Sequence, residues 1–335
     1  MKGGSALAVS ALRRARREHG KIRRSAELSL RAASCDWKRA LEAPGSNCFI
    51  GGLTGRSGTS WLLRLVGEAM EGKAAAIGEH GVFVLSQFRG AAYEFYQAPR
   101  GEVTRRAYLG YFRSFMLDYA YDRHRIYGVG GHGLRNWMPR HPIRAALDRL
   151  ESEAMAAPTL AECQLCFGRF YSRLMTIAAV LEADTTSWVS KEPPYGRHAT
   201  DLHALIPDCR LVVLARDGRD TALSMAKLGW HGGDVRRCMD RWKAFAGQSL
   251  EAIERLPETS VLLLRYEDVI EDASASLQRV LDFFGFGGLD LPSTPPSLEP
   301  PLRGNTGKWI GKLDSESREY FDRTCGELSR RLGYD

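Results

Sequence analysis

Residues 51–70 read GGLTGRSGTSWLLRLVGEAM, and they carry the clearest structural signal in the chain. The apolar run NCFIGG (47–52) is typical of a short strand that is buried on both faces. A glycine-rich turn follows it and leads into a helix. Unpaired backbone amides and the positive end of a helix converge at such a turn, so this stretch predicts a binding site for an anion.

The turn differs from the phosphate loop of nucleotide triphosphatases. That loop has four residues between its glycines and a lysine directly after the second glycine. Here five residues separate Gly52 from Gly58, and Thr59 stands where the lysine would be. Without a lysine for a β- or γ-phosphate, the ATPase and kinase interpretations are weakened. Arg56 lies inside the turn, where it is placed to meet a single 5′-phosphate group.

Further strands and helices alternate along the chain. The other apolar runs with strand character are RLVVLA (210–215), SVLLLR (260–265) and the weaker SWVS (187–190). Amphipathic helical segments separate them, including residues 170–184, residues 240–256 and a stripe formed by Leu277, Val280, Leu281 and Phe284. This alternation predicts an α/β fold with a central parallel β-sheet flanked by helices, in a phosphate-loop-like arrangement.

The organisation of the chain follows from changes in its composition. Residues 1–45 are predicted to be a basic N-terminal extension, either helical or disordered, and residues 46–335 a single domain. Aromatic residues, arginine and glycine dominate about 86–160, which we interpret as a helical insertion or lid because the sheet pattern resumes after it. A proline-rich loop (291–302) precedes a terminal helix that Asp314 or Ser315 can cap.

The positive charge is concentrated in the extension. The chain has a net charge of +7, and residues 1–40 contain 11 of its 47 Lys and Arg but only 3 of its 40 Asp and Glu. The part of the chain after residue 40 is therefore almost neutral, and we expect no nucleic-acid partner. The extension is interpreted as a solvated basic helix, a peripheral contact with a membrane surface or polyanion, or an organelle transit peptide. The N-terminus lacks the apolar core of a secretory signal, so the expected location is the cytoplasm.

The cysteines indicate neither a disulfide framework nor a metal site. There are seven, an odd number without regular spacing. Cys163 and Cys166 form a single CxxC, whereas a zinc ribbon needs a second pair. They are predicted to be small apolar residues on a helix face, and no metal is expected.

A second anion-binding point is predicted in RDGRDTALS (216–224). Arg216 follows a predicted strand at its C-terminal end, the edge at which open α/β sheets bind ligands, and Ser224 lies eight residues further on. An arginine and a hydroxyl group in this setting suit a second phosphate. The alternative is an ion pair of Arg216 with Asp217 or Asp220.

Taken together, these motifs resemble those of the sulfotransferases that use 3′-phosphoadenosine 5′-phosphosulfate (PAPS). RSGTSWL (56–62) is similar to their 5′-phosphosulfate loop, K/R-S-G-T-T/S-W-L, and RDGRDTALS to their 3′-phosphate segment. LLLRYEDV (262–269) resembles the strand and turn that follow in many members, and RGNTGKW (303–309) their C-terminal loop K/R-G-x-x-G-x-W. The resemblance runs in order from about 47 to 312.

The resemblance implies a site and a reaction. PAPS would be the co-substrate, and its sulfuryl group would pass to a hydroxyl group, or as a second choice an amine, of a small-molecule, glycan or lipid acceptor. Lys191 resembles the family lysine that bridges donor and acceptor oxygens, and Arg56 would stabilise the leaving phosphate. The implied nucleotide-binding residues are Arg56, Ser57, Gly58, Thr59, Ser60, Trp61, Arg216, Ser224, Tyr266, Arg303 and Gly304.

The general base departs from the pattern of the phenol and steroid sulfotransferases. Those enzymes have a histidine two residues after the lysine, where this chain has Pro193. Tyrosylprotein and several bacterial sulfotransferases use a glutamate about two dozen residues after the loop, and Glu79 lies 23 residues after Arg56. Glu79 is therefore the first candidate for the base, ahead of His80 and Glu192, although a structural role for Glu79 stays open.

Two other classes of function stay open at this stage. One is a phosphoryl-transferring kinase with a phosphate loop, and the other is a nucleotide-binding protein without catalytic activity. Residues 80–160 are expected to line the acceptor pocket, with His132 as a loop or substrate-contact residue. The sequence identifies neither the acceptor nor the oligomeric state.

Overall fold

The structure is a computed structural model that describes residues 23–78, 85–97, 102–122, 133–289 and 305–334. Within these ranges, parallel strands form a sheet in the order β2-β3-β1-β4-β5. The strands are β1 (Cys48–Gly52), β2 (Ala75–Ile77), β3 (Trp188–Lys191), β4 (Arg210–Ala215) and β5 (Val261–Arg265). The predicted central parallel sheet is confirmed, and β2 is the strand that the sequence did not reveal.

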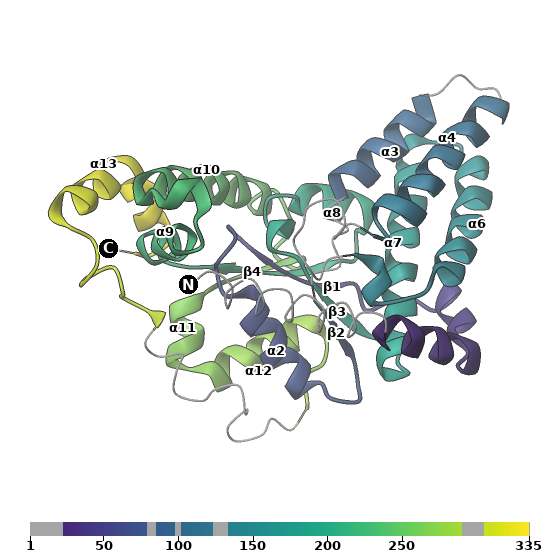
Figure 1. Ribbon diagram of the computed structural model, residues 1–335, viewed down its shortest axis with the longest axis horizontal. Helices are drawn as coiled ribbons and strands as arrows, with labels where there is room; N and C mark the ends of the chain where they lie inside the picture. Colours follow the sequence, from purple (N-terminus) through teal and green to yellow (C-terminus); the bar gives the residue numbers. More distant parts are fainter. Residues whose placement is uncertain (1–22, 79–84, 98–101, 123–132, 290–304, 335) are drawn as a thin grey trace, which may run out of the picture.

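Helices cover both faces of the sheet (Figure 1). On one face lie α2 (Thr59–Ala69), α11 (Tyr266–Glu271) and α12 (Ala273–Phe284). On the other lie α9 (Gly218–Lys227) and α10 (Val235–Ile253), with α13 (Ser315–Arg331) packed beside α10. The N-terminus of α13 is capped by Asp314, which accepts a hydrogen bond of 2.7 Å from the Ser317 amide. Of the two predicted caps, Asp314 is thus the one used.

A further group of helices forms a bundle beside the sheet (Figure 1). Its members are α3 (Leu85–Gln97), α4 (Glu102–Ser114), the π-helical turn η2 (Phe115–Tyr119), η3 (Leu134–Asn136), α6 (Arg140–Ala156) and α7 (Leu160–Ala183). Apart from α7, these elements occupy the region predicted to be a helical insertion. In the part of the chain that the structure describes, no helix has the length and apolar character needed to cross a membrane.

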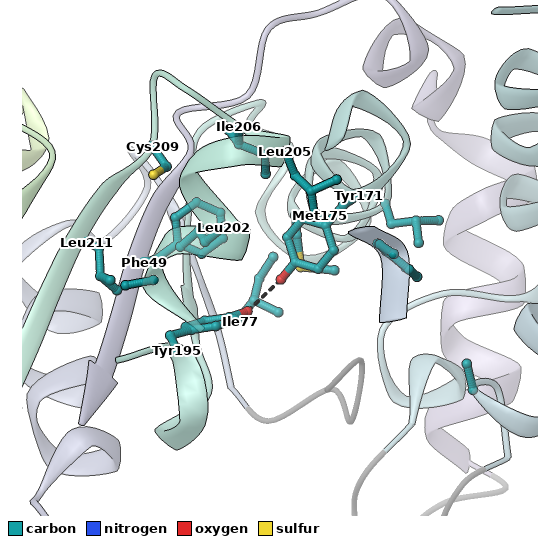
Figure 2. Packing of buried hydrophobic residues seen from close by; sticks show 14 of the residues in the cluster. Phe49, Ile77, Tyr171, Met175, Tyr195, Leu202, Leu205, Ile206, Cys209 and Leu211 are labelled. Carbon is teal, nitrogen blue, oxygen red and sulfur yellow. Dashed lines mark hydrogen bonds between the residues drawn. The ribbon is translucent and has the colours of Figure 1, made fainter. Parts of the chain in front are cut away.

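The main core lies where α7 meets the sheet and α8 (Ala199–Leu205). Phe49 of β1 packs edge-on against Tyr195 of η4 (Pro193–Tyr195), with their ring centroids 5.3 Å apart. The Tyr195 and Tyr171 hydroxyls form a hydrogen bond of 2.6 Å within this apolar cluster (Figure 2). A Cβ added to Gly168 would lie 1.8 Å from the Leu205 carbonyl oxygen, so glycine allows α7 to approach α8 closely. This packing fixes the end of β3, where Lys191 lies.

Part of the basic N-terminal segment is packed on the domain. Residues 23–34 form a helix whose Leu28 belongs to the main core, and η1 (Trp37–Leu41) follows it. Arg31 Nη1 donates hydrogen bonds of 2.8 Å to the carbonyl oxygens of Leu181 and Glu182, at the C-terminus of α7. Arg39 donates to the Asp184 carbonyl oxygen at 3.0 Å. Residues 23–34 are thus helical and largely exposed, as one of the alternatives held, but the helix is packed on the domain through Leu28 and Ala32. Residues 1–22 lie outside the described ranges.

Candidate active site

The sheet places the two predicted anion points in one crevice. β1 and β4 are neighbours, yet β1 leads into α2 on one face and β4 into α9 on the other (Figure 1). Ligands of open α/β sheets bind at the carboxyl ends of strands whose connections diverge in this way. The Leu53 amide donates to the Leu214 carbonyl oxygen at 3.1 Å, which keeps the two strand ends together as they diverge.

A cleft of about 1230 Å³ opens at this point. Its volume exceeds the range of roughly 300–1,000 Å³ that is usual for one small ligand, so it has room for a nucleotide and a second molecule. Among the described residues that line it, Asp220 is the one carboxylate. The cationic side chains on its walls are Arg56, Arg197, Arg216, Lys227, Arg241, Lys308 and Lys312. This excess of positive charge favours a ligand that carries several negative charges.

The backbone of the loop before α2 is shaped to hold an anion. Gly58 has a φ of 96°, and a Cβ added to it would lie 2.5 Å from Cδ2 of Tyr266. Arg56 also has a positive φ, 71°, which is uncommon for a residue other than glycine. Helix α2 starts at Thr59, and the Trp61 and Leu62 amides donate to the carbonyl oxygen of its N-cap, Gly58, at 3.0 and 3.1 Å, so the amides before Trp61 are the ones that a helix start leaves for a ligand. The loop therefore presents backbone donors at the positive end of α2.

The hydroxyl groups of the loop have different roles. Ser60 lines the cleft, as does Thr59. Ser57 is only 1% exposed, and its Oγ donates a hydrogen bond of 2.9 Å to the Thr54 carbonyl oxygen. Ser57 is one of the residues implied to bind the nucleotide, but its hydroxyl group closes the loop from inside. Only its backbone amide is left for a ligand.

Lys191 brings an ammonium group to the loop from the neighbouring strand. It is the last residue of β3, 2% exposed, and its Nζ donates a hydrogen bond of 2.9 Å to Ser60 Oγ. A lysine thus contacts the start of α2 although the residue after Gly58 is a threonine. The predicted strand-end lysine and the predicted loop are brought together by the β1–β3 pairing.

Arg216 is held by backbone groups from two distant segments. Its Nη1 donates to the Arg56 carbonyl oxygen at 3.2 Å, and its Nη2 donates to the Asn305 carbonyl oxygen at 2.6 Å. Its Nε is buried and has no hydrogen-bond partner among the residues that the structure describes. Asp217 forms its ion pair with Arg219 instead, at 2.8 Å, so the alternative pairing of Arg216 with Asp217 is wrong. Arg216 thus keeps a buried donor at the cleft.

The side chain of Arg56 points in a direction that the sequence did not predict. Its Nε donates a hydrogen bond of 3.1 Å to Ser224 Oγ on α9. The expectation placed Arg56 at the 5′-phosphate and Ser224 at the 3′-phosphate. In this structure the two side chains lie together, and Arg216 contacts the same loop. All three residues therefore belong to one site, with Arg56 turned toward Ser224.

Aromatic rings and a C-terminal segment complete the wall around Arg216. The Arg216 guanidinium lies 4.8 Å from the centroid of the Tyr266 ring, which packs edge-on against Trp61 at 5.6 Å. The Trp309 amide donates to Asp220 Oδ1 at 2.9 Å. Burial raises the pKa of Asp220, although the nearby Arg216 opposes this shift. The segment that begins at Asn305 is thus fixed against α9.

Several predicted residues lie outside the described part of the chain. These are the candidate bases Glu79 and His80, the loop residue His132, and Arg303 and Gly304 of the C-terminal motif. The remaining candidate base, Glu192, is 1% exposed and does not line the cleft.

Sequence reasoning missed part of the cleft wall. Asp220, Arg197, Arg241 and Phe245 all line the cleft but were not predicted to bind a ligand. Arg241 and Phe245 are four residues apart in α10, a spacing that places them on the same helix face. The sequence shows this pairing, but it does not show that this face of α10 meets the cleft.

All the cysteines except Cys35 occupy buried positions. Cys163 and Cys166 lie on α7, 0% and 2% exposed, as predicted for small apolar residues on a helix face. Throughout the described ranges, no three His, Cys, Asp or Glu side chains are grouped as ligands for a metal ion.

A parallel sheet with a glycine-rich loop at the divergence of β1 and β4, below a cationic cleft, defines an α/β fold of the phosphate-loop-like class. The model of the sulfotransferase family matches residues 48–289, most of the chain. The protein therefore belongs to the sulfotransferase family.

Individual relatives are distant. Protein-tyrosine sulfotransferase A from Caenorhabditis elegans is 25% identical over 174 residues, and the match spans only 44% of this chain and 44% of that protein. The sulfotransferase domain of the Synechococcus PCC 7002 olefin synthase is 19% identical, with coverage of 86% of this chain and 94% of that chain and a TM-score of 0.48. Sulfotransferase STF9 from Mycobacterium avium is 15% identical, with coverage of 89% and 80% and a TM-score of 0.42. Family membership rests on the family model rather than on these likenesses.

Proposed function

We propose that the protein transfers a sulfuryl group from PAPS to a hydroxyl group of a small-molecule, glycan or lipid acceptor. The observation that carries this proposal is the meeting of two phosphate-binding points in one cationic cleft. The loop before α2 supplies one point, and Arg216 with Ser224 supplies the other. PAPS carries a phosphosulfate at the 5′ position and a phosphate at the 3′ position of its ribose, so a single nucleotide would engage both points.

The residues of the cleft fit this nucleotide. The buried Arg216 Nε is a donor that an anionic oxygen of the ligand would satisfy. Ser224 and Arg56 lie beside it, and Trp61 and Tyr266 offer aromatic surface next to the loop. Arg303 and Gly304, which directly precede Asn305, are proposed to close over the nucleotide.

The catalytic roles follow from charge and position. When bound, PAPS supplies an activated sulfuryl group: the bond from sulfur to the 5′-phosphate oxygen breaks, a bond from sulfur to the acceptor oxygen forms, and adenosine 3′,5′-bisphosphate leaves. Lys191 and the amides at the start of α2 are proposed to stabilise negative charge on the leaving oxygen, and the contact of Lys191 Nζ with Ser60 Oγ, which lines the cleft, supports this role. We propose Glu79 as the base that takes the acceptor proton.

The test compares wild-type protein with Lys191→Ala in a cell extract supplied with PAPS, using untargeted mass spectrometry for metabolites that gain one sulfate. We expect Lys191→Ala to bind adenosine 3′,5′-bisphosphate about as tightly as the wild type and to lose about 10²–10³-fold in turnover. Lys73→Ala is the matched control, because Lys73 is exposed and does not line the cleft.

Two outcomes would contradict the proposal in different ways. Retained turnover in Lys191→Ala would remove this lysine from the mechanism. Tight binding of adenosine 3′,5′-bisphosphate by a wild-type protein that sulfates nothing would instead indicate a nucleotide-binding protein without catalytic activity.

A further inference from the structure

Two arginines share one aromatic ring on the wall of the cleft. The Arg197 guanidinium lies 4.3 Å from the centroid of the Phe245 ring, and the Arg241 guanidinium lies 3.7 Å from it. Arg197 comes two residues after η4, whereas Arg241 and Phe245 belong to α10. All three residues line the cleft. We call these three residues the arginine pair site.

No carboxylate in the described ranges forms an ion pair with either arginine of this site. Elsewhere in the same ranges arginines do have such partners, as Arg89 has Asp201 at 2.8 Å. Burial lowers the pKa of Arg197, and the positive charge of Arg241 lowers it further. The two positive charges repel each other, as the effect of Arg241 on the pKa of Arg197 shows, and an anion bound to both would offset that cost.

The arginine pair site is distinct from both phosphate points. Those points are formed by the loop before α2 and by Arg216 with Ser224. Arg197 instead belongs to the turn that follows Lys191, the residue proposed to bridge donor and acceptor. A Cβ added to Gly196 would lie 2.5 Å from the Gly52 carbonyl oxygen, so this turn packs tightly against the end of β1. The arginine pair site is therefore attached rigidly to the strands that carry the catalytic residues.

We propose that the arginine pair site binds an anionic group of the acceptor, so that the substrate is a hydroxyl compound carrying a carboxylate or another oxyanion. Guanidinium groups bind oxyanions through paired hydrogen bonds, and stacking on Phe245 restricts both side chains before the ligand arrives. This inference rests on the proposed sulfotransferase function and specifies its substrate class.

The first experiment uses calorimetry to measure how tightly two probes bind to protein saturated with adenosine 3′,5′-bisphosphate. The probes are 4-hydroxyphenylacetate and its uncharged amide. We expect the acid to bind about tenfold more tightly than the amide or better, because charge-assisted hydrogen bonds form only with the acid. Arg197→Gln and Arg241→Gln should each remove most of this preference while the nucleotide affinity stays within about threefold.

The control variant is Arg279→Gln, because Arg279 is exposed on α12 and does not line the cleft. It should bind both probes as the wild type does. Equal affinity for acid and amide in the wild type, including no binding of either, would overturn the arginine pair site. A loss of nucleotide affinity in Arg197→Gln would also overturn it, since the arginines would then serve PAPS.

The second experiment uses ³⁵S-labelled PAPS and a cell extract divided by anion exchange into retained and unretained metabolites. The two fractions serve separately as the source of acceptors. If metabolites of the retained fraction become labelled, and less so with Arg197→Gln, the result supports the proposal. If only metabolites of the unretained fraction become labelled, the result contradicts it. Absence of label from both fractions would count against the sulfotransferase function itself. The calorimetric comparison then decides on the arginine pair site separately.

Discussion

Gly58 is the residue at which the phosphate-binding loop becomes helix α2. Its φ of 96° lies in a region that side chains other than glycine rarely adopt. Its Cα also faces the Tyr266 ring, which leaves no room for a Cβ. The position is thus constrained twice, by backbone conformation and by a neighbour that itself lines the cleft.

Replacing Gly58 by alanine is expected to weaken nucleotide binding. The new Cβ would lie 2.5 Å from Cδ2 of Tyr266 and must displace either the loop or the ring. We expect the affinity for adenosine 3′,5′-bisphosphate to fall by about tenfold or more, measured by calorimetry. Gly72→Ala is the matched control, because Gly72 has a similar φ of 74° but nothing within 4 Å of an added Cβ. It should cost only about 1–2 kcal/mol of stability, and an equal effect of both variants on nucleotide affinity would refute the steric argument.

At the scale of single residues, the sequence predicted which side chains meet but not how they point. Three separate segments of the sequence pointed to Arg56, Lys191 and Arg216, and in the structure Lys191 and Arg216 both contact the loop that contains Arg56. The sequence did not show that Ser57 turns inward or that Arg56 reaches Ser224. Those directions depend on partners that the fold supplies from a different element, more than 150 residues away for Ser224.

The element that positions Arg216 is the start of α9. The Asp217 amide, directly after Arg216, donates a hydrogen bond of 3.1 Å to Glu267 Oε1 on α11. The other carboxylate oxygen, Oε2, accepts a hydrogen bond of 2.7 Å from the Tyr334 hydroxyl. Burial raises the pKa of Glu267 above its ordinary value of 4.5, although both hydrogen bonds oppose the shift. Glu267 thus joins α9, α11 and the C-terminus of the chain.

The raised pKa of Glu267 predicts how stability changes with pH. In the window between pH 4.5 and the raised pKa, the folded state keeps the proton that the unfolded state has lost. The contribution is therefore present below pH 4.5 and is lost as the pH rises through the raised value. Urea unfolding of wild type and Glu267→Gln should show the wild type losing free energy of unfolding relative to the variant, by at most about 1.4 kcal/mol per pH unit. If the free energy of unfolding of the wild type minus that of Glu267→Gln stayed constant or increased with pH, this assignment would be contradicted.

At the scale of elements, long apolar runs were predictable and short or docked segments were not. The runs at 210–215 and 260–265 became β4 and β5 almost without change. β2 was not predicted because a strand of three residues, Ala75–Ile77, is too short and too weakly apolar to be recognised in the sequence. The packing of residues 23–34 on the domain was also missed, since Arg31 binds backbone carbonyl groups that are left without helical partners only where α7 ends.

At the scale of the whole molecule, charge distribution matters more than net charge. The chain after residue 40 is nearly neutral, yet the described lining of the cleft has seven cationic side chains and one carboxylate. These cations come from segments as far apart as Arg56 and Lys312. Only the folded arrangement gathers them, so the sequence could predict the two phosphate points but not the cationic wall between the helices.

The central claim is that one nucleotide is held at both ends in this cleft. The most direct test is the ratio of affinities for adenosine 3′,5′-bisphosphate and 5′-AMP, which differ only in the 3′-phosphate, measured by calorimetry on wild type and Arg216→Gln. We predict that wild type favours the bisphosphate by about 100-fold and that Arg216→Gln loses most of this preference, because charge-assisted hydrogen bonds to the 3′-phosphate disappear. Equal affinities in the wild type, or tighter binding of ATP with Mg²⁺ than of the bisphosphate, would contradict the account.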